Sequence, residues 1–283
     1  MKRCLSNQEG MPICYLVATP IGNKSELSPR AIEVLSSVAV VGCEDTRNTG
    51  ALFASFSIHT KRISCHEHNE EEASTLLLSY LKRGESIAYV SDAGYPGISD
   101  PGRRLVARCI EEGFAVSVIS GSNAMLTALV GSGLDTNHFY FHGFLPGKES
   151  ERVKELLLLR EKKETMIFYE SPHRIKETLQ NMYDVFGRRS AVIARELTKK
   201  FEEYIRGDLG EFLDIPKETL LGEMVIVVEG NHETISHFEE AFSYMEELHE
   251  EGIQVKLCAK IAAERFLENK NELYREWSKR KNS

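Results

Sequence analysis

The first half of the chain alternates short apolar runs with segments whose apolar residues recur at helical spacing. Runs of strand-forming residues lie at 13–18, 38–42, 61–64, 86–91 and 114–119. Helical spacing follows them at 29–35, 52–56, 71–83, 105–110 and 125–130. This alternation predicts a doubly wound sheet of parallel strands with helices on both faces.

The second half has a different pattern. Apolar runs predict strands at 139–141, 165–170, 191–197, 201–206 and 223–229. Helical spacing is clear only at about 150–161 and 172–186, where Ser171-Pro172 suits a helix start. Consecutive strands between 191 and 206 favour a hairpin, and therefore a mixed α/β domain. Beyond residue 236 the pattern becomes entirely helical. The predicted organisation is an N-terminal α/β domain at 12–121, a second α/β domain at 122–231, and a small helical module at 236–283.

A glycine- and proline-rich segment at 91–102 joins the strand at 86–91 to the next helix. Connections of this kind usually have two to six residues, and this one is longer. Asp92 stands at the end of the strand, where it can accept hydrogen bonds from ribose hydroxyls or an amino group. Asp100 is expected to cap the following helix, with Pro101 in its first turn. Because ligands bind at the carboxyl ends of parallel strands, we predict a ligand site here.

Polar residues also follow other strands, at 19–23, 44–47 and 120–124, so these loops are expected to meet at one edge of the sheet. Glu44-Asp45-Thr46-Arg47 fits either a helix cap with an internal ion pair or acid and base groups that face a cleft. In the second domain, Tyr169–Arg174 and Arg195–Lys199 are equally dense in ionisable side chains. Salt-bridged surfaces are the alternative interpretation of both segments.

Charge and composition exclude several classes of protein. The 283 residues carry a formal net charge of −8, which argues against a simple polycation that coats nucleic acid. Positive charge is nevertheless concentrated in residues 252–283, which hold eight Lys or Arg and four Glu. No dinucleotide-binding glycine motif, phosphate-binding lysine loop or hydrolase serine motif is present. These absences argue against an ordinary Rossmann cofactor enzyme, an NTPase and a hydrolase.

Cysteine usage and hydropathy bear on the compartment and on metal binding. Six scattered cysteines, several of them in apolar runs, predict reduced thiols and a cytoplasmic location. No apolar run is long enough for a membrane span, and no signal peptide is expected. Cys65-His66-Glu67-His68 lacks a second pair of ligands, so no structural metal site is expected.

Several separated motifs resemble one family in the same order. They are Val17–Asn23, Glu44–Arg47, His66–Glu70, Ser91–Gly102, Gly143–Pro146, Tyr169–Arg174, Ala194–Lys199 and Gly222–Val225. Together they resemble the tetrapyrrole (corrin/porphyrin) methylases, and among them the enzymes that methylate small-subunit ribosomal RNA. The resemblance covers about residues 12–231, and the basic helical tail is similar to the terminal module of that group. Two departures are the segment 120–123, where the family has a proline-glycine loop, and Tyr95 in place of a threonine.

The resemblance implies the tetrapyrrole-methylase fold, with a cofactor cleft between two α/β domains. It implies S-adenosylmethionine as the methyl donor, a decoding-centre cytidine of 16S rRNA in the small ribosomal subunit as the acceptor through its ribose 2′-hydroxyl, and a homodimer. No metal or membrane is implied. The implied cofactor-binding residues are Pro20, Ser91, Asp92, Ala93, Gly94, Tyr95, Ser122, Ala124, Tyr169, Ala194 and Met224.

A ribose hydroxyl is a weak nucleophile, so a neighbouring carboxylate or amine is expected to take or steer its proton. The candidates for this catalytic role are Asp45, Glu170 and Lys199. The faces of Tyr95 and Tyr169 are suited to contact a sulfonium.

Two alternatives stay open at this point. One is a small-molecule methylase of the same fold that acts on a tetrapyrrole, which has no need of a basic module. The other is a non-catalytic ribosome-assembly factor that binds RNA and requires no cofactor.

Overall fold

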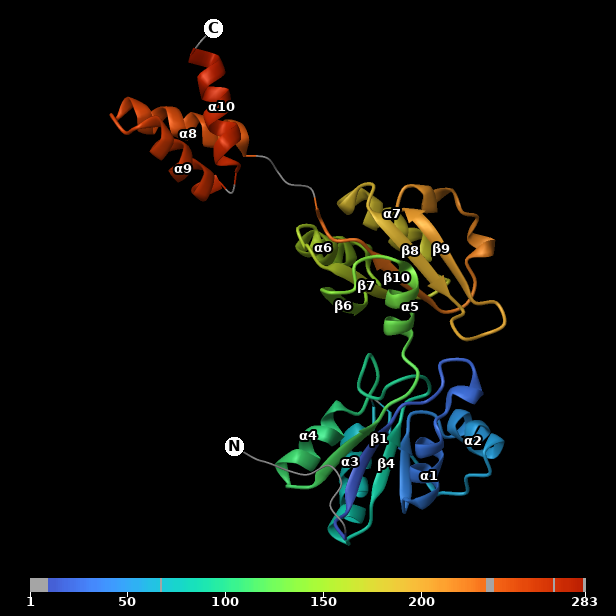
Figure 1. The fold of residues 1–283 in the computed structure, drawn as a ribbon. Helices are drawn as coiled ribbons and strands as arrows, with labels where there is room; N and C mark the ends of the chain where they lie inside the picture. Colours follow the sequence, from blue (N-terminus) through green and yellow to red (C-terminus); the bar gives the residue numbers. More distant parts are fainter. Residues whose placement is uncertain (1–9, 67, 233–236, 267, 282–283) are drawn as a thin grey trace. The chain divides into compact units, whose positions relative to one another are not determined.

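The computed structural model describes residues 10–66, 68–232, 237–266 and 268–281. The chain forms two compact units, one that ends at Asn231 and one that begins at His232. The larger unit contains two five-stranded sheets, and the smaller contains helices (Figure 1).

The first sheet is entirely parallel, as the alternating pattern predicts. Its strands are β1 (Ile13–Val17), β2 (Val40–Cys43), β3 (Arg62–Ser64), β4 (Ile87–Val90) and β5 (Ala115–Ile119), in the order β3-β2-β4-β1-β5. The helices α1 (Pro29–Ser37), α2 (Thr46–Ser55), α3 (Glu70–Lys82) and α4 (Arg103–Glu111) follow its first four strands. One apolar cluster joins the sheet to α1 and α2 through Leu35 and Phe53, and another joins it to α3 and α4 through Leu77 and Leu105. The sheet is therefore covered on both faces (Figure 1).

The start of α4 differs from the prediction. The helix begins at Arg103, its N-cap is Gly102 at φ +130°, and no side chain of the N-cap residue completes the cap. Glu70 of α3 provides a partner instead, because its carboxylate accepts a hydrogen bond from the Gly102 amide at 3.1 Å. Asp100 and Pro101 stay in the loop, where the Pro101 carbonyl accepts from the Gly97 amide at 3.1 Å. Asp100 is thereby free of the capping role and available to a ligand site.

The second sheet is mixed, which confirms the prediction for this half. Its strands are β6 (Phe139–Phe144), β7 (Thr165–Glu170), β8 (Ser190–Arg195), β9 (Glu203–Asp208) and β10 (Met224–Val228), in the order β6-β7-β10-β8-β9. Only β6 and β7 pair in parallel, and β8 and β9 form the predicted antiparallel pair. The helices α6 (Glu149–Leu159) and α7 (Ile175–Phe186) pack on one face, and α5 (Ala124–Ser132) packs on the other.

The helix α7 starts later than Ser171-Pro172 suggests. Its first residue is Ile175 and its N-cap is Arg174, because the carboxylate of Glu170 binds the Ser171 amide and the chain makes a turn first. Short 3₁₀ helices occur at η1 (Lys24–Glu26), η2 (Glu211–Asp214) and η3 (Lys217–Thr219).

The smaller unit consists of α8 (Phe238–Glu250), α9 (Val255–Phe266) and α10 (Lys270–Lys281). Its helices share a core of small and apolar residues that includes Phe242, Met245, Ala259 and Leu273. None of the described helices has the length and hydropathy of a membrane span. The described cysteines are free and buried, as expected for reduced thiols; they are Cys14, Cys43, Cys65, Cys109 and Cys258.

Candidate functional site

A cavity of about 370 Å³ lies where the loops after β1, β4 and β5 meet the carboxyl end of β7 and the start of β10. Its wall combines loops that follow strands of the first sheet with strand residues of the second sheet, at strand ends that the sequence singles out. The lining residues are Ile21, Ala93, Gly94, Tyr95, Ile98, Ser99, Asp100, Asn123, Ala124, Phe144, Tyr169, Glu170, Ser171, Pro172, Leu197, Glu223, Met224 and Val225.

Hydrogen bonds hold the loops of the first domain together at this cavity. Thr19 and Gly94 form an isolated antiparallel bridge, with their amides donating to each other's carbonyls at 2.9 and 3.0 Å. Gly94 has φ +74°, a conformation that side-chain-bearing residues rarely adopt. The Ser91 hydroxyl donates to the Gly94 carbonyl at 3.2 Å, and the Tyr95 hydroxyl accepts from the Gly121 amide at 3.2 Å. Hydrogen bonds within the protein therefore hold the backbone of this rim in place.

Acidic side chains give the cavity a negative character. Asp100, Glu170 and Glu223 contribute to its wall. Burial, reinforced by the nearby carboxylates of Glu44 and Asp92, raises the pKa of Asp100 to about 6. Burial also raises the pKa of Tyr169, to which the charge of Asp100 contributes. A cationic ligand would relieve this crowding of negative charge.

A second cavity of about 650 Å³ shares Ser99 and Asp100 with the first. Glu44 and Glu70 line it together with residues 101–104 and Ala107. Two arginines stand at this cavity, Arg103 and Arg104, and both are exposed. The two cavities thus offer adjacent spaces for two ligands, one of which could be large.

Part of the predicted site lies on the wall of the first cavity and part lies outside it. The predicted residues that line it are Ala93, Gly94, Tyr95, Ala124, Tyr169, Glu170 and Met224. The predicted residues outside its lining are Pro20, Asp45, Ser91, Asp92, Ser122, Ala194 and Lys199.

The residues outside the lining support the rim or the core. Ser91 is buried against its own loop, and Ala194 is buried in the cluster under α5. The Ser122 hydroxyl donates to Glu26 at 2.7 Å. Asp92 accepts from the Asp45 amide at 3.2 Å and from the Asn48 side chain at 2.7 Å, so it links two loops of the first domain.

Asp45 has the geometry of a helix cap with an ion pair, one of the two interpretations of its motif. Its carboxylate accepts from the Arg47 amide at 2.7 Å and pairs with the Arg47 guanidinium at 2.8 Å. These contacts with Arg47 lower the pKa of Asp45 to about 2. A catalytic role for Asp45 stays a prediction.

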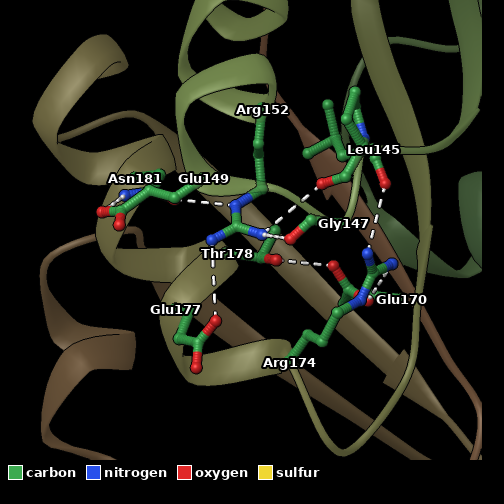
Figure 2. A network of polar contacts seen from close by, with 10 residues as sticks. Leu145, Gly147, Glu149, Arg152, Glu170, Arg174, Glu177, Thr178 and Asn181 are labelled. Atoms are coloured by element: carbon green, nitrogen blue, oxygen red, sulfur yellow. Dashed lines mark hydrogen bonds and ion pairs between the residues drawn. The ribbon is translucent and has the colours of Figure 1, made fainter.

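Glu170 lies at the cavity with its carboxylate turned into the protein (Figure 2). Its side chain is 1% exposed and accepts from the Thr178 hydroxyl at 2.5 Å and the Ser171 amide at 2.8 Å. The Arg174 guanidinium pairs with it at 3.0 Å. Both oxygens are thus occupied by protein donors, which favours a structural contribution to the cavity wall.

Lys199 lies between two carboxylates. Its ammonium group contacts Glu223 at 2.9 Å and Glu196 at 3.0 Å. Burial lowers the pKa of Lys199, but the hydrogen bonds to Glu223 and Glu196 outweigh it, so the pKa lies above its ordinary value. The side chain therefore keeps its proton at neutral pH and reaches the cavity only through Glu223.

Several lining residues were not predicted. They are Ile21, Ile98, Ser99, Asp100, Asn123, Phe144, Ser171, Pro172, Leu197, Glu223 and Val225. Most of them lie within the strand-end motifs that the sequence already marks or directly next to them. The signal that identifies them is therefore the whole motif with its apolar neighbours, and not only its polar residues. Asp100 is predicted to cap α4, but the N-cap is Gly102 and Asp100 lies in the cavity wall.

Among the described residues, no group of three or more His, Cys, Asp or Glu could hold a metal ion. Glu67 of the cysteine- and histidine-containing segment lies outside the described residues.

Comparisons with known proteins agree with this architecture. The family model of the Tetrapyrrole (Corrin/Porphyrin) Methylases matches residues 14–213. "Ribosomal RNA small subunit methyltransferase I" of Bacillus subtilis is 45% identical over 237 residues, which are 83% of this chain and 81% of the relative. The protein of the same name from Vibrio cholerae is 44% identical over 272 residues and 94% of each chain, so the match extends into the helical unit.

The fold is also found among solved structures. Uroporphyrin-III C-methyltransferase from Thermus thermophilus superposes with a TM-score of 0.54 at 19% identity, over 77% of this chain and 94% of that one. At this level of identity the likeness shows a common fold.

Proposed function

Because the chain belongs to the tetrapyrrole (corrin/porphyrin) methylases, and among them to the ribosomal RNA small subunit methyltransferases I, we propose that it methylates the ribose 2′-hydroxyl of cytidine 1402 in 16S rRNA. S-adenosylmethionine is the methyl donor of this family. The observation that carries the choice of substrate is the 44% identity that extends over 94% of both chains in the Vibrio cholerae relative. A tetrapyrrole substrate has no comparable support, since uroporphyrin-III C-methyltransferase from Thermus thermophilus shares the fold at 19% identity.

The residues of the first cavity fit this donor. S-adenosylmethionine carries a positive sulfonium and a positive ammonium group, and the wall offers the carboxylate of Asp100 together with that of Glu223, which also pairs with Lys199. Tyr95 and Tyr169 add aromatic surface that is suited to a sulfonium. When bound, the donor supplies an electrophilic methyl group.

The chain's own contribution is to position the two reactants. Methyl transfer needs the hydroxyl oxygen in line with the bond that breaks, so a fixed geometry accounts for much of the rate. The bridge between Thr19 and Gly94 fixes the donor side. Apolar side chains such as Ile21, Leu197 and Val225 exclude water from the same space.

We propose positioning roles for two of the three predicted catalytic residues. Glu170 holds Arg174 and the turn that follows β7, and Lys199 holds Glu223 at the cavity. Asp100 reaches both cavities, and its ionised form complements the positive donor. The second cavity, with Arg103 and Arg104 beside it, provides room for the nucleotide that carries the hydroxyl.

A homodimer on the small ribosomal subunit is part of the proposal. Exposed apolar side chains on α5 support it, since Val130 is 74% exposed and Leu126 is 44% exposed in the single chain. Light scattering of the purified protein tests this part, and a monomer at working concentration would contradict it.

The central experiment uses small ribosomal subunits from cells that lack the enzyme. They are incubated with the protein and S-adenosylmethionine labelled in its methyl group, and the labelled nucleotide is mapped by nuclease digestion. We expect label on the ribose of cytidine 1402, where a 2′-O-methyl group also blocks alkaline cleavage. Label on a base or on another nucleotide would refute the proposed specificity. No label at all would favour a non-catalytic RNA-binding factor.

A further inference from the structure

Phe144 is an aromatic residue at the first cavity whose side chain is largely open to solvent. It is the last residue of β6, lines the cavity, and is 53% exposed. Its ring packs edge-on against Tyr169 at 5.5 Å between centroids, and Tyr169 packs edge-on against Phe141 at 5.0 Å. The three rings form a row that leads from the apolar cluster under α5 to the cavity. Its outer end presents an aromatic surface that no described residue covers completely.

The backbone before Phe144 is adapted to this placement. The register of β6 against β7 shifts between Phe141 and Gly143, and Gly143 has φ +83°. A Cβ atom added at Gly143 would lie 3.4 Å from the Ser99 hydroxyl of the loop that lines both cavities. The irregularity therefore places the backbone just before Phe144 next to Ser99, which lines both cavities.

The backbone after Phe144 is held by two arginines (Figure 2). Arg174 donates to the Leu145 carbonyl at 3.4 Å. Arg152, which is 1% exposed, donates to the Gly147 carbonyl at 3.1 Å and the Pro146 carbonyl at 3.5 Å. The carbonyl groups of the three residues that follow Phe144 thus accept hydrogen bonds from arginine side chains and not from a neighbouring strand.

Both arginines are themselves anchored. The Arg152 Nε donates to Asn181 of α7 at 2.7 Å, and its guanidinium lies 3.6 Å from Glu177 of the same helix. Arg174 is paired with Glu170 (Figure 2). Burying a guanidinium destabilises the fold unless its N–H donors are satisfied. Because the donors of Arg152 are satisfied by these carbonyls and by α7, the buried side chain favours one conformation of the backbone after β6.

We propose that Phe144 is the platform on which the pyrimidine base of the target nucleotide stacks, and that Arg152 and Arg174 are positioning residues that fix its backbone. The inference rests on the proposed function. Sequence-specific RNA recognition relies on unstacked bases that lie on aromatic side chains, and a planar neutral base suits this ring better than a phosphate would beside acidic walls. Because Phe144 lines the first cavity, a base on its exposed face would hold its ribose beside the donor in that cavity.

The first test replaces Phe144 and measures two quantities with the full-length protein. For Phe144→Ala we expect kcat/KM for small subunits to fall roughly tenfold or more, as loss of one base–aromatic stack does elsewhere, with the Kd for S-adenosylmethionine unchanged within about twofold. Phe144→Trp should restore most of the activity. Phe139→Ala is the matched control, because Phe139 begins the same strand, is 40% exposed and does not line the cavity.

The remaining outcomes distinguish a failure of the stacking inference from a failure of the proposed function. Unchanged kcat/KM in Phe144→Ala would overturn the inference, and so would a rise in the cofactor Kd that accounts for the whole loss. If the wild-type protein leaves small subunits unlabelled, the proposed function fails first, and this variant is not needed to show it.

A double-mutant cycle tests the positioning role of Arg174. Arg174→Lys keeps a positive charge for Glu170 but cannot reach the Leu145 carbonyl with the same planar fork. We expect it to lower kcat/KM for small subunits, and we expect the double variant Phe144→Ala/Arg174→Lys to be no worse than Phe144→Ala alone. Additive losses would show that Arg174 acts independently of Phe144 and would overturn this part.

Discussion

Replacing Glu170 by Gln should weaken folding more than chemistry. The substitution keeps the shape of the side chain but removes its charge and converts one acceptor oxygen into an NH₂ donor. The structure gives that side chain three protein donors, from Thr178, Ser171 and Arg174. The amide oxygen can keep the Ser171 amide and Arg174, and the NH₂ group then faces the Thr178 hydroxyl, which has to turn and accept. The Arg174 guanidinium, 28% exposed, loses its anionic partner.

The magnitude follows from the burial of the pair. Removing one partner of a fully buried pair costs about 3–5 kcal/mol. Because water still reaches part of Arg174, we expect about 2–4 kcal/mol for Glu170→Gln. For a folding unit of this size, about 1 kcal/mol lowers Tm by roughly 2–4 °C, so the expected decrease is about 5–15 °C.

Differential scanning calorimetry of the full chain measures this shift, with Thr178→Val as a milder comparison. That variant removes one donor from Glu170 and leaves the ion pair with Arg174, so its cost should be about 1 kcal/mol. Single-turnover methylation at a temperature where both variants are folded completes the experiment. A Glu170→Gln protein with the wild-type Tm and a turnover reduced a hundredfold or more would refute the positioning role and restore Glu170 as a catalytic acid or base.

Four further outcomes can be checked with the same materials. Gly94→Ala should weaken S-adenosylmethionine binding in calorimetry, whereas Gly84→Ala, at a similar φ of +83° with open space around it, should leave it unchanged. Affinity for the cationic donor should rise as pH increases through about 6, where Asp100 ionises, and Asp100→Asn should flatten this dependence. Lys199→Arg should retain activity, because the side chain acts as a fixed positive charge, and a complete loss would indicate proton transfer by the amine. A folded truncation that lacks residues 232–283 should bind small subunits more weakly and with a flatter salt dependence while it keeps its cofactor affinity, and full affinity would leave the module without an RNA role.

The fold could be predicted from the sequence because its signals are local and mutually consistent. Every predicted strand and helix occurs near its expected position, since apolar periodicity and caps such as Ser28, which accepts from the Ala31 amide at the start of α1, act over a few positions. The predictions are wrong where a residue far away in the sequence provides a hydrogen bond that is expected from a local one. The N-cap of α4 is the clearest case, because Glu70, far away in the sequence, binds the Gly102 amide and leaves Asp100 to the cavity.

The site could be predicted only as a set of loops. The strand-end rule identifies which segments meet, but it does not say which side chain of a segment faces the ligand. The Ser91 side chain turns back to its own loop and Asp92 turns to Asp45 and Asn48, while Asp100 and Phe144, which lie within marked motifs, line the cavity. One partner of Lys199, Glu196, lies in the same motif, but Glu223 lies just before β10, so this second contact depends on tertiary structure that spacing does not encode.

Acidic and basic side chains are distributed unevenly over the two units of the chain. A cationic donor requires acidic walls, and the same walls repel the phosphates of an RNA that must approach them. Contacts to phosphate therefore have to be made by other surfaces. In the helical unit, Arg280 is paired with Glu239 and Glu276, whereas Lys256, Lys270 and Arg275 have no acidic partner among the contacts of the described residues. If the proposed function holds, a protein with a net charge of −8 would in this way keep the proposed donor cavity negative and still offer local positive charge to ribosomal RNA.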